Sequence, residues 1–290
     1  LQMYDAHCHP QLVQGYDPLP HLSETGTESL LVANGTHPSD WQPLLDQCRS
    51  SNDMMVPALG VHPMNVSRVV TEDTDAKGET SLTVLDRMLT EGRAKGSLVH
   101  VGETGLDGRL TKGLSAEDAA RERESQEHMF SEHCRLAVKH QCPVQVHIIS
   151  RKPSCWPVLT ATLQRHTPPA VVLHAYSGSL DNFVQVLMPL NCYLSVAPFV
   201  LDKTAKKMRR CARECPLDRL LIETDMDDAM WTEHRGEGDG EDDDLSTCVY
   251  QCHSSLWDAT VAEVAMLRGM DPDQVAQACR DNLRRVLGMD

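Results

Sequence analysis

Aromatic residues, long apolar runs and basic residues are all scarce in this sequence. Tyr, Trp and Phe make up 4% of its 290 residues, which leaves few rings that could stack on nucleic-acid bases. No run of eighteen apolar residues occurs, and the first residues are not a basic stretch followed by an apolar one. We therefore expect neither a membrane-spanning helix nor a signal peptide, and we expect a cytoplasmic protein, with nuclear or mitochondrial presence left open.

The eleven cysteines lack the regular spacing of a disulfide-stapled secreted domain, so free thiols in a reducing compartment are expected. Cys248 and Cys252, followed by His253, raise the alternative of a zinc clip. No second pair with zinc-finger spacing follows them, and two thiols one helical turn apart are more often packing residues.

Acidic residues outnumber basic ones by 42 to 27, which gives a formal net charge of −15. This charge disfavours tight non-specific binding to duplex nucleic acid, although a cleft that holds metal cations can reverse the local sign. The glycine-rich acidic run at 237–244 has no apolar anchors, so we interpret it as a solvated loop.

Short apolar runs alternate with longer amphipathic segments along the whole chain. This alternation predicts a parallel sheet with right-handed crossovers, and eight such units within this length favour a (β/α)8 TIM-like barrel with outer helices. A doubly wound open sheet is the alternative. The predicted strands are 3–8, 29–34, 55–61, 97–103, 143–148, 170–174, 192–197 and 220–223, and the predicted helices are 39–51, 79–95, 116–141, 153–165, 180–188, 202–214, 254–268 and 271–287.

Six of the eight predicted strands end in a histidine or a carboxylate. In a parallel barrel the carboxyl ends of the strands face a common opening, so these side chains are expected to converge. The residues concerned are His7 and His9, His62, Glu103 with Asp107, His147, His174, and Glu223 with Asp225.

Imidazole and carboxylate groups suit divalent metals. His7, His9, His147, His174, Glu103 and Asp225 are too many for one tetrahedral site, so we expect two ions that share a carboxylate. Glu103 is the natural bridge because its two oxygens can each bind one ion.

These segments resemble the TatD family of metal-dependent hydrolases, a branch of the amidohydrolase superfamily with a distorted TIM barrel. The motif variant Asp-Ala-His-Cys-His looks closest to the fungal Cut9-interacting Scn1-like branch of that family. The resembling segments lie in family order at 5–9, 60–63, 102–107, 146–147, 174–179, 216–225 and 282–285. The resemblance implies a single domain over 1–290 and an acidic loop at 227–247 that borders the active site.

The resemblance further implies a magnesium-dependent deoxyribonuclease that trims single-stranded DNA from the 3′ end, with Mn²⁺ or Zn²⁺ as alternative ions. By this match, one ion is held by His7, His9 and Asp225, the other by His147 and His174, and Glu103 is shared. Asp225 would orient or deprotonate the attacking water, and His62 would donate to the scissile phosphate. Glu223 would steady a ligand, and no obligate protein partner is implied.

The sequence also departs from the family pattern. Ile149 stands where the family has an arginine, and Arg151 lies two positions later. Asp227 and Asp228 add negative charge beside the expected opening, and the candidate base-stacking rings are Tyr176 and Trp231, the latter more simply a loop anchor. Two other functions therefore stay open: hydrolysis of a small phosphate or carbonyl ester, and a non-catalytic binding protein that kept the barrel.

A basic group at 203–213 is a less favoured phosphate site. Its members are Lys203, Lys206, Lys207, Arg209, Arg210 and Arg213. They fall on the predicted helix before the last strand, on the outside of the barrel, where a solvated charged face is the simpler interpretation.

Overall fold

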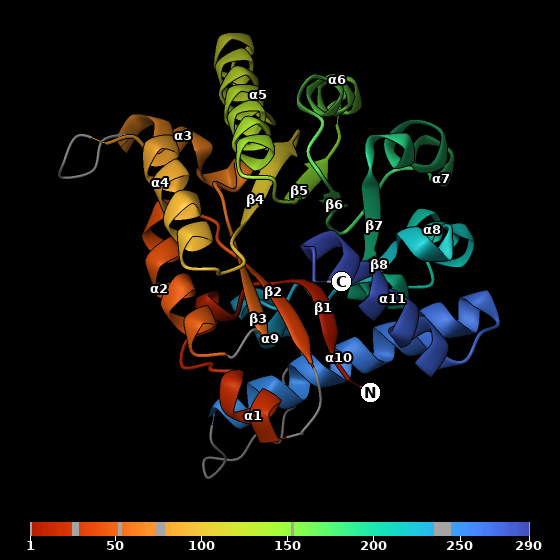
Figure 1. Cartoon of the computed structure of the whole chain (residues 1–290). Helices are drawn as coiled ribbons and strands as arrows, with labels where there is room; N and C mark the ends of the chain where they lie inside the picture. Colours follow the sequence, from red (N-terminus) through yellow and green to blue (C-terminus); the bar gives the residue numbers. More distant parts are fainter. Residues whose placement is uncertain are drawn as a thin grey trace.

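Strands and helices alternate along the whole chain in the computed structural model, which describes residues 2–24, 29–51, 54–72, 79–151, 154–234 and 245–289. Eight parallel strands pair in the order of the sequence and form a nearly closed barrel (Figure 1). The predicted barrel is confirmed, and the open doubly wound sheet is excluded because the strand order never reverses. The strands are β1 Tyr4–Cys8, β2 Leu30–Asn34, β3 Met55–Leu59, β4 His100–Asp107, β5 Val144–Ile149, β6 Val171–Leu173, β7 Cys192–Val196 and β8 Leu220–Ile222.

Helices surround the barrel (Figure 1). They are α1 Leu19–Glu24, α2 Pro38–Arg49, α3 Pro63–Glu72, α4 Ser81–Ala94, α5 Ala116–Lys139, α6 Trp156–His166, α7 Leu180–Asn182, α8 Lys206–Glu214, α9 Asp228–His234, α10 Leu245–Arg268 and α11 Pro272–Leu287. A π-helical turn at Phe183–Leu187 continues α7, and 3-10 turns lie at Pro10–Leu12, Met188–Leu190, Pro198–Leu201 and Leu217–Arg219.

Two helix starts follow directly from the sequence. The Ser115 side chain accepts a hydrogen bond from the Asp118 N–H at the start of α5. Asp271 and Gln274 form a capping box at the start of α11, with Pro272 at the first helical position. In both places the cap satisfies backbone N–H groups that have no partner within the helix.

The structure corrects several predicted boundaries. Strand β4 continues to Asp107 because Gly102 and Gly105 adopt φ angles of +144° and +145°, which lets the chain keep pairing with β5 beyond Glu103. The predicted helix at 202–214 begins only at Lys206, since the Asp202 side chain accepts from both the N–H and the hydroxyl of Thr204 and holds a turn there.

The predicted loop at 227–247 is partly helical. Residues 228–234 form α9, and α10 begins at Leu245 instead of near residue 254. Trp231 of α9 is 8% exposed, as expected of an anchor in the core. The acidic run at 237–244 lies outside the described residues.

The last strand and the first are joined just beyond the end of β8. The Asp225 N–H donates to the His7 carbonyl at 3.0 Å, and the His9 N–H donates to the Met226 carbonyl at 2.8 Å. These bonds bring the strand ends that carry His7, His9 and Asp225 side by side, so closure of the barrel also brings together residues that lie far apart in the sequence.

Three further predictions concern the cysteines, the basic residues of α8 and membrane-spanning helices. No disulfide joins any of the eleven cysteines in the described structure, and most of them are buried. On α8, Arg210 pairs with Asp181 at the surface, as expected of a solvated charged face, whereas the pair of Arg209 with Glu263 is less than one fifth exposed. Within the described part of the chain, none of the helices combines the length and the apolar character needed to cross a membrane.

Candidate metal centre

The residues predicted as ligands converge at the carboxyl ends of the strands. His7 and His9 lie at the end of β1, Glu103 within β4, His147 within β5, His174 just after β6, and Asp225 just after β8. All the imidazoles and Glu103 are buried, whereas the side chain of Asp225 is 34% exposed. Asp225 is therefore the member of this set that faces solvent most.

One group of donor atoms has the size of a coordination sphere. His7 Nε2 lies 3.1 Å from His9 Nε2 and 3.4 Å from Glu103 Oε2, and His9 Nε2 lies 3.3 Å from the same oxygen. Asp225 Oδ1 lies 3.9 Å from His7 Nε2 and 3.6 Å from His9 Nε2. Donor atoms at the corners of a tetrahedron around an ion with bonds of about 2.1 Å are about 3.4 Å apart, so these four atoms fit one divalent ion.

A second group lies on the other side of the two carboxylates. Glu103 Oε1 is 3.0 Å from His147 Nδ1 and 3.9 Å from His174 Nε2. Asp225 Oδ2 is 3.7 Å from His174 Nε2. Glu103 and Asp225 therefore each turn one oxygen toward each group, which is the arrangement that two neighbouring ions about 3.5–4 Å apart require.

Four of the histidines have an oxygen atom behind the ring, within 3.4 Å of the outer nitrogen, and turn the inner nitrogen toward the centre. This pattern is typical of metal-ligating histidines, whose outer partner fixes the tautomer and the ring orientation. The outer contacts are His7 Nδ1 with Gln145 Oε1 at 3.4 Å, His9 Nδ1 with the Asn34 carbonyl at 2.7 Å, His147 Nε2 with Asp107 Oδ2 at 3.2 Å, and His174 Nδ1 with Glu223 Oε1 at 2.8 Å.

His62 shows the opposite pattern. Its Nδ1 accepts a hydrogen bond from the Met64 N–H at 3.1 Å, so the proton of the neutral ring lies on Nε2. Burial is the largest of the effects that lower the pKa of His62 to about 4, which keeps the ring neutral near pH 7. His62 Nε2 lies 3.3 Å from His147 Nδ1 and 3.5 Å from Glu103 Oε1. His62 thus turns an N–H toward the centre, whereas each of the other four rings turns a nitrogen that can bind an ion once it carries no proton.

The carboxylate and the imidazoles stabilise each other's charged forms. Burial alone would raise the pKa of Glu103, but the surrounding histidines hold it well below its ordinary value. Burial likewise opposes protonation of His9, but the hydrogen bond and the charge of Glu103 raise the pKa of His9 to about 9. In the metal-free protein, protonated imidazoles therefore supply the positive charge that metal ions would supply at this centre.

Glycine is required at two positions where the chain backbone lies against the backbone of a predicted metal ligand in the next strand. A Cβ on Gly105 would lie 1.9 Å from the His147 carbonyl oxygen, and a Cβ on Gly60 would lie 2.5 Å from the Glu103 carbonyl oxygen. No side chain fits at either distance, so the two glycines let the backbones that carry Glu103 and His147 approach closely.

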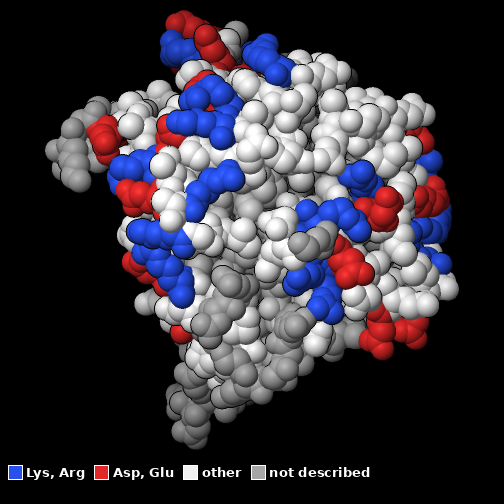
Figure 2. Space-filling view, viewed as in Figure 1, with Lys and Arg blue, Asp and Glu red and all other residues white. Residues whose placement is uncertain are grey.

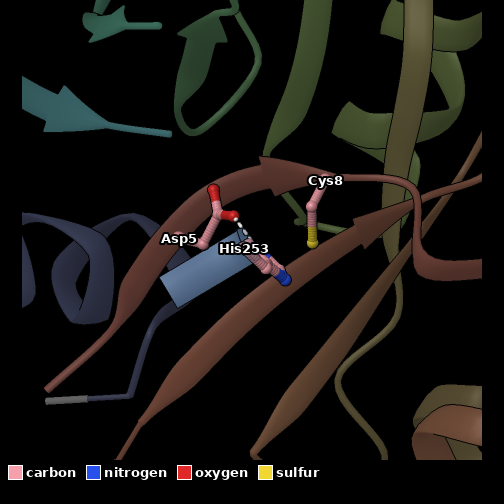
Figure 3. Close-up of side chains that lie close together, drawn as sticks. All are labelled: Asp5, Cys8 and His253. Carbon is pink, nitrogen blue, oxygen red and sulfur yellow. Dashed lines mark hydrogen bonds and ion pairs between the residues drawn. The ribbon is translucent and has the colours of Figure 1, made fainter. Parts of the chain in front are cut away.

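A separate buried network ties β1 to β8 and α10. Asp5 accepts hydrogen bonds from the His7 N–H at 3.1 Å, the Thr224 N–H at 3.0 Å, the Thr224 hydroxyl and His253 Nε2 at 2.7 Å. The second nitrogen of His253 lies 2.8 Å from the Tyr16 hydroxyl. Cys8 lies nearby without a bond to Asp5 or His253 (Figure 3), and its thiol points to the Val32 carbonyl.

These three residues, Asp5, Cys8 and His253, are close enough to hold an ion. Both nitrogens of His253 and both oxygens of Asp5 already have partners, so hydrogen bonding accounts for the cluster without a metal. The alternative of a zinc clip built from Cys248, Cys252 and His253 is wrong in the described structure, because His253 turns to Asp5 instead.

His253→Leu is expected to lower the free energy of unfolding by about 2–3 kcal/mol, because the buried Asp5 carboxylate loses one of its donors. Tyr16→Phe removes only the outer bond of the same network, with an expected cost of about 1 kcal/mol. Urea denaturation followed by circular dichroism measures both. Equal stability of His253→Leu and the unmodified protein would contradict the network as a support of the barrel.

Tyr176 and Arg151, the two further residues predicted to contact substrate, lie in different environments. Tyr176 is fully buried, its ring packs edge-on against Trp156 and Phe183, and its hydroxyl donates to the Ser179 carbonyl at 3.0 Å. It has no free ring face, so the interpretation of Tyr176 as a base-stacking residue is wrong. Arg151 is exposed in the loop after β5, on the same side of the barrel as His147.

Asp107 and Arg109 were not predicted to act together. Asp107 is 1% exposed, contacts His147 from behind and binds Arg109 Nη2 at 2.5 Å. Arg109, half exposed, is thus held beside the centre through one intervening carboxylate. The only sequence signal is the spacing of two between Asp107 and Arg109, which is too common to be informative.

Comparison with known proteins agrees with this geometry. A family described as TatD related DNase matches residues 4–288. The uncharacterized metal-dependent hydrolase YcfH of Escherichia coli K12 is 28% identical over 239 residues, which cover 82% of this chain and 76% of that protein. The 3'-5' ssDNA/RNA exonuclease TatD of Erwinia tasmaniensis is 26% identical over 267 residues, which cover 92% of this chain and 90% of that protein.

A solved structure shares the fold over almost the full length. The crystal structure of YJJV, a TatD homologue from Escherichia coli K12, aligns with a TM-score of 0.65 at 24% identity and covers 98% of this chain and 97% of its own. With the family match over residues 4–288, the chain belongs to the TatD-related DNase family of metal-dependent hydrolases.

Proposed function

We propose that this protein is a two-metal phosphodiesterase that acts as a deoxyribonuclease and removes nucleotides from the 3′ end of single strands. Magnesium is the proposed ion, with manganese or zinc as alternatives, since carboxylates and imidazoles accept all three. A relative that is 26% identical over 92% of this chain bears the name 3'-5' ssDNA/RNA exonuclease, which supports the substrate class.

The orientation of the five histidines carries the proposal. Four rings turn one nitrogen toward two groups of donor atoms that share Glu103 and Asp225, and the fifth, His62, turns an N–H toward the same space. When bound, a pair of divalent ions supplies charge that polarises the phosphoryl group and acidifies the attacking water. A neutral donor beside that pair suits a phosphate oxygen that gains negative charge during the reaction.

The protein's own groups have distinct roles in this proposal. Asp225, the exposed carboxylate of the set, accepts the proton from the water that attacks phosphorus as the bond to the 3′ oxygen breaks. His62 donates from Nε2 to a non-bridging oxygen. Glu223 and Asp107 hold His174 and His147 in the required orientation from behind. Arg109 or Arg151 provides the cation for a neighbouring phosphate.

The proposal is tested with single-stranded oligonucleotides labelled at the 5′ end and incubated with Mg²⁺, Mn²⁺ or Zn²⁺. The expected product is a ladder that shortens one nucleotide at a time, and a block at the 3′ hydroxyl should stop it. RNA, nitrophenyl phosphodiesters and lactones form the comparison panel. Absence of hydrolysis of every nucleic acid with every ion would overturn the assignment.

One observation favours a second candidate, hydrolysis of a small ester by the same centre. Ile149 ends β5 where an arginine would contact phosphate in the family, and the guanidinium of Arg109 is already paired with Asp107. A site with few free cations is poorly suited to a long polyanion. Faster turnover of nitrophenyl phosphates or lactones than of any oligonucleotide in the same panel would favour this candidate.

Metal binding is expected to release protons and to strengthen as the pH rises from 6 to 9. The pKa of His9 is raised to about 9, and the pKa values of His147 and His174 are also raised, so these rings carry protons in the metal-free protein that an ion must displace. At a pH below these raised pKa values, protons compete with the ion for the imidazole nitrogens. At a pH above them, this competition ends. Titration calorimetry in two buffers of different ionisation enthalpy counts the released protons, and an affinity independent of pH over this range would contradict the mechanism.

A further inference from the structure

A cavity of about 610 Å³ lies at the end of the barrel opposite the metal centre. Its walls are the segments that precede β4 to β8 and the last turn of α11, so it is found where the strands begin. Helix α11, whose last turn lines the cavity, is labelled in Figure 1, and Figure 2 shows Lys and Arg side chains interspersed with Asp and Glu on this face.

The cavity is basic in a protein that is strongly acidic overall. Arg93, Arg219 and Arg285 line it, and none of its described lining residues is Asp or Glu. With a formal net charge of −15 for the whole chain, such a concentration of positive charge without carboxylates creates a local potential that attracts anions.

The three guanidinium groups retain capacity to bind a ligand. Arg219 donates to Asn191 Oδ1 at 2.9 Å and lies over the Tyr193 ring at 4.9 Å from its centroid, and Arg285 donates to Asn282 Oδ1 at 2.9 Å. Among the described residues, no carboxylate forms an ion pair with any of the three arginines of the cavity. The arginines of α8 differ, because Arg209 and Arg210 are neutralised by Glu263 and Asp181.

A buried histidine in the cavity wall lacks hydrogen-bond partners. His100 begins β4, lines the cavity and is 4% exposed. Within the part of the chain that the structure describes, neither of its ring nitrogens has a partner. Burial lowers the pKa of His100 to about 3, so the neutral ring offers one donor and one acceptor. Buried polar groups are costly when unpaired, so this ring indicates a polar ligand within the cavity.

We propose that this cavity is a binding site for a small organic molecule that carries a phosphate group. Guanidinium forks match phosphate oxygens in pairs, and three of them without carboxylates suit an anion of more than one charge. The volume falls within the range of small-molecule sites and is far larger than a bare phosphate ion needs. Leu98, Pro143 and Val286 supply apolar wall against which the organic part can pack.

The site is independent of the proposed reaction. Its residues precede or begin the strands or belong to the end of α11, whereas the metal ligands lie in the later part of the strands or just after them. A failure of the nuclease assignment would therefore leave this inference standing, and the reverse also holds.

The test uses titration calorimetry with the full protein at constant ionic strength. AMP is the probe, and inorganic phosphate, pyrophosphate and adenosine are the comparison arms. AMP is expected to bind, and the double substitution Arg93→Gln with Arg285→Gln should weaken it by about tenfold or more, because charge-assisted hydrogen bonds are lost. Both arginines are exposed, so the fold should survive, and circular dichroism checks this.

The matched control is the double substitution Arg121→Gln with Arg135→Gln on α5, because both arginines pair with surface carboxylates and neither lines the cavity. This control should bind AMP like the unmodified protein, and chelation of metals with EDTA should leave the affinity unchanged. Loss of binding on chelation would place AMP at the metal centre and overturn the proposal. Equal affinity of the two double variants, equal affinity for phosphate and AMP, or no binding of AMP at millimolar concentration would overturn it as well.

Discussion

Glu103→Gln is expected to abolish both stable metal binding and hydrolysis. Glu103 lies between the two groups of donor atoms, with Oε2 3.4 and 3.3 Å from His7 and His9 and Oε1 3.0 Å from His147. The amide has the same shape, but it carries no charge and has only one acceptor oxygen, so it can no longer serve both groups. Loss of several kcal/mol of transition-state stabilisation corresponds to a fall in kcat of about 10³-fold or more.

The measurement combines metal analysis of the purified variant with its turnover rate. Glu132→Gln on the outer face of α5 is the matched control, since Glu132 pairs with the surface residue Arg135. The control should keep full metal content and full activity. Retention of two ions in Glu103→Gln would show that Glu103 is not the shared ligand. Thermal unfolding should stay cooperative, because the substitution changes neither volume nor backbone.

Residue type at the strand ends made the metal centre predictable. Parallel strands in a barrel turn their carboxyl ends to one opening, so the positions of His7, His147 and His174 in the sequence already imply convergence. The structure brings all six predicted ligands into contact, with neighbouring donor atoms 3.0–3.9 Å apart.

The orientation of each ring could not be predicted, because it depends on partners that are distant in sequence. His7 is oriented by Gln145, which lies 138 positions away, and the Asp5 network depends on His253, which lies 248 positions away from Asp5. The same limit explains the wrong interpretation of Tyr176. Only the packed structure shows that Trp156 and Phe183 cover its ring.

Local side-chain hydrogen bonds explain the boundaries that sequence periodicity missed. Periodicity reports which face of an element is apolar, and it does not report a turn such as the one that Asp202 forms with Thr204. The extension of β4 to Asp107 depends on φ angles that glycine permits, and the pattern of apolar residues does not predict these angles. Asp107 was predicted to lie at the same opening, but its contact with His147 Nε2 depends on this extension of β4.

Asp225→Asn is expected to separate catalysis from metal binding. Asp225 has a φ of +55°, in the left-handed region where asparagine is among the best tolerated side chains, so the backbone should keep its course. One carbonyl oxygen remains to face the ions, and His7, His9 and Glu103 keep their positions. The amide cannot accept a proton from water, so kcat should fall by about 10²–10⁴-fold.

Metal content and kcat, measured on the same preparation, decide this prediction. Asp225→Asn should lose less metal than Glu103→Gln, because Asp225 stays 3.6–3.9 Å from the histidine nitrogens, whereas Glu103 approaches three of them to 3.0–3.4 Å. Asp46→Asn on the exposed face of α2 should change neither quantity. Loss of metal equal to that of Glu103→Gln would make Asp225 a ligand with no separate role in proton transfer. Unchanged kcat with full metal content would instead assign the proton to another acceptor at the centre.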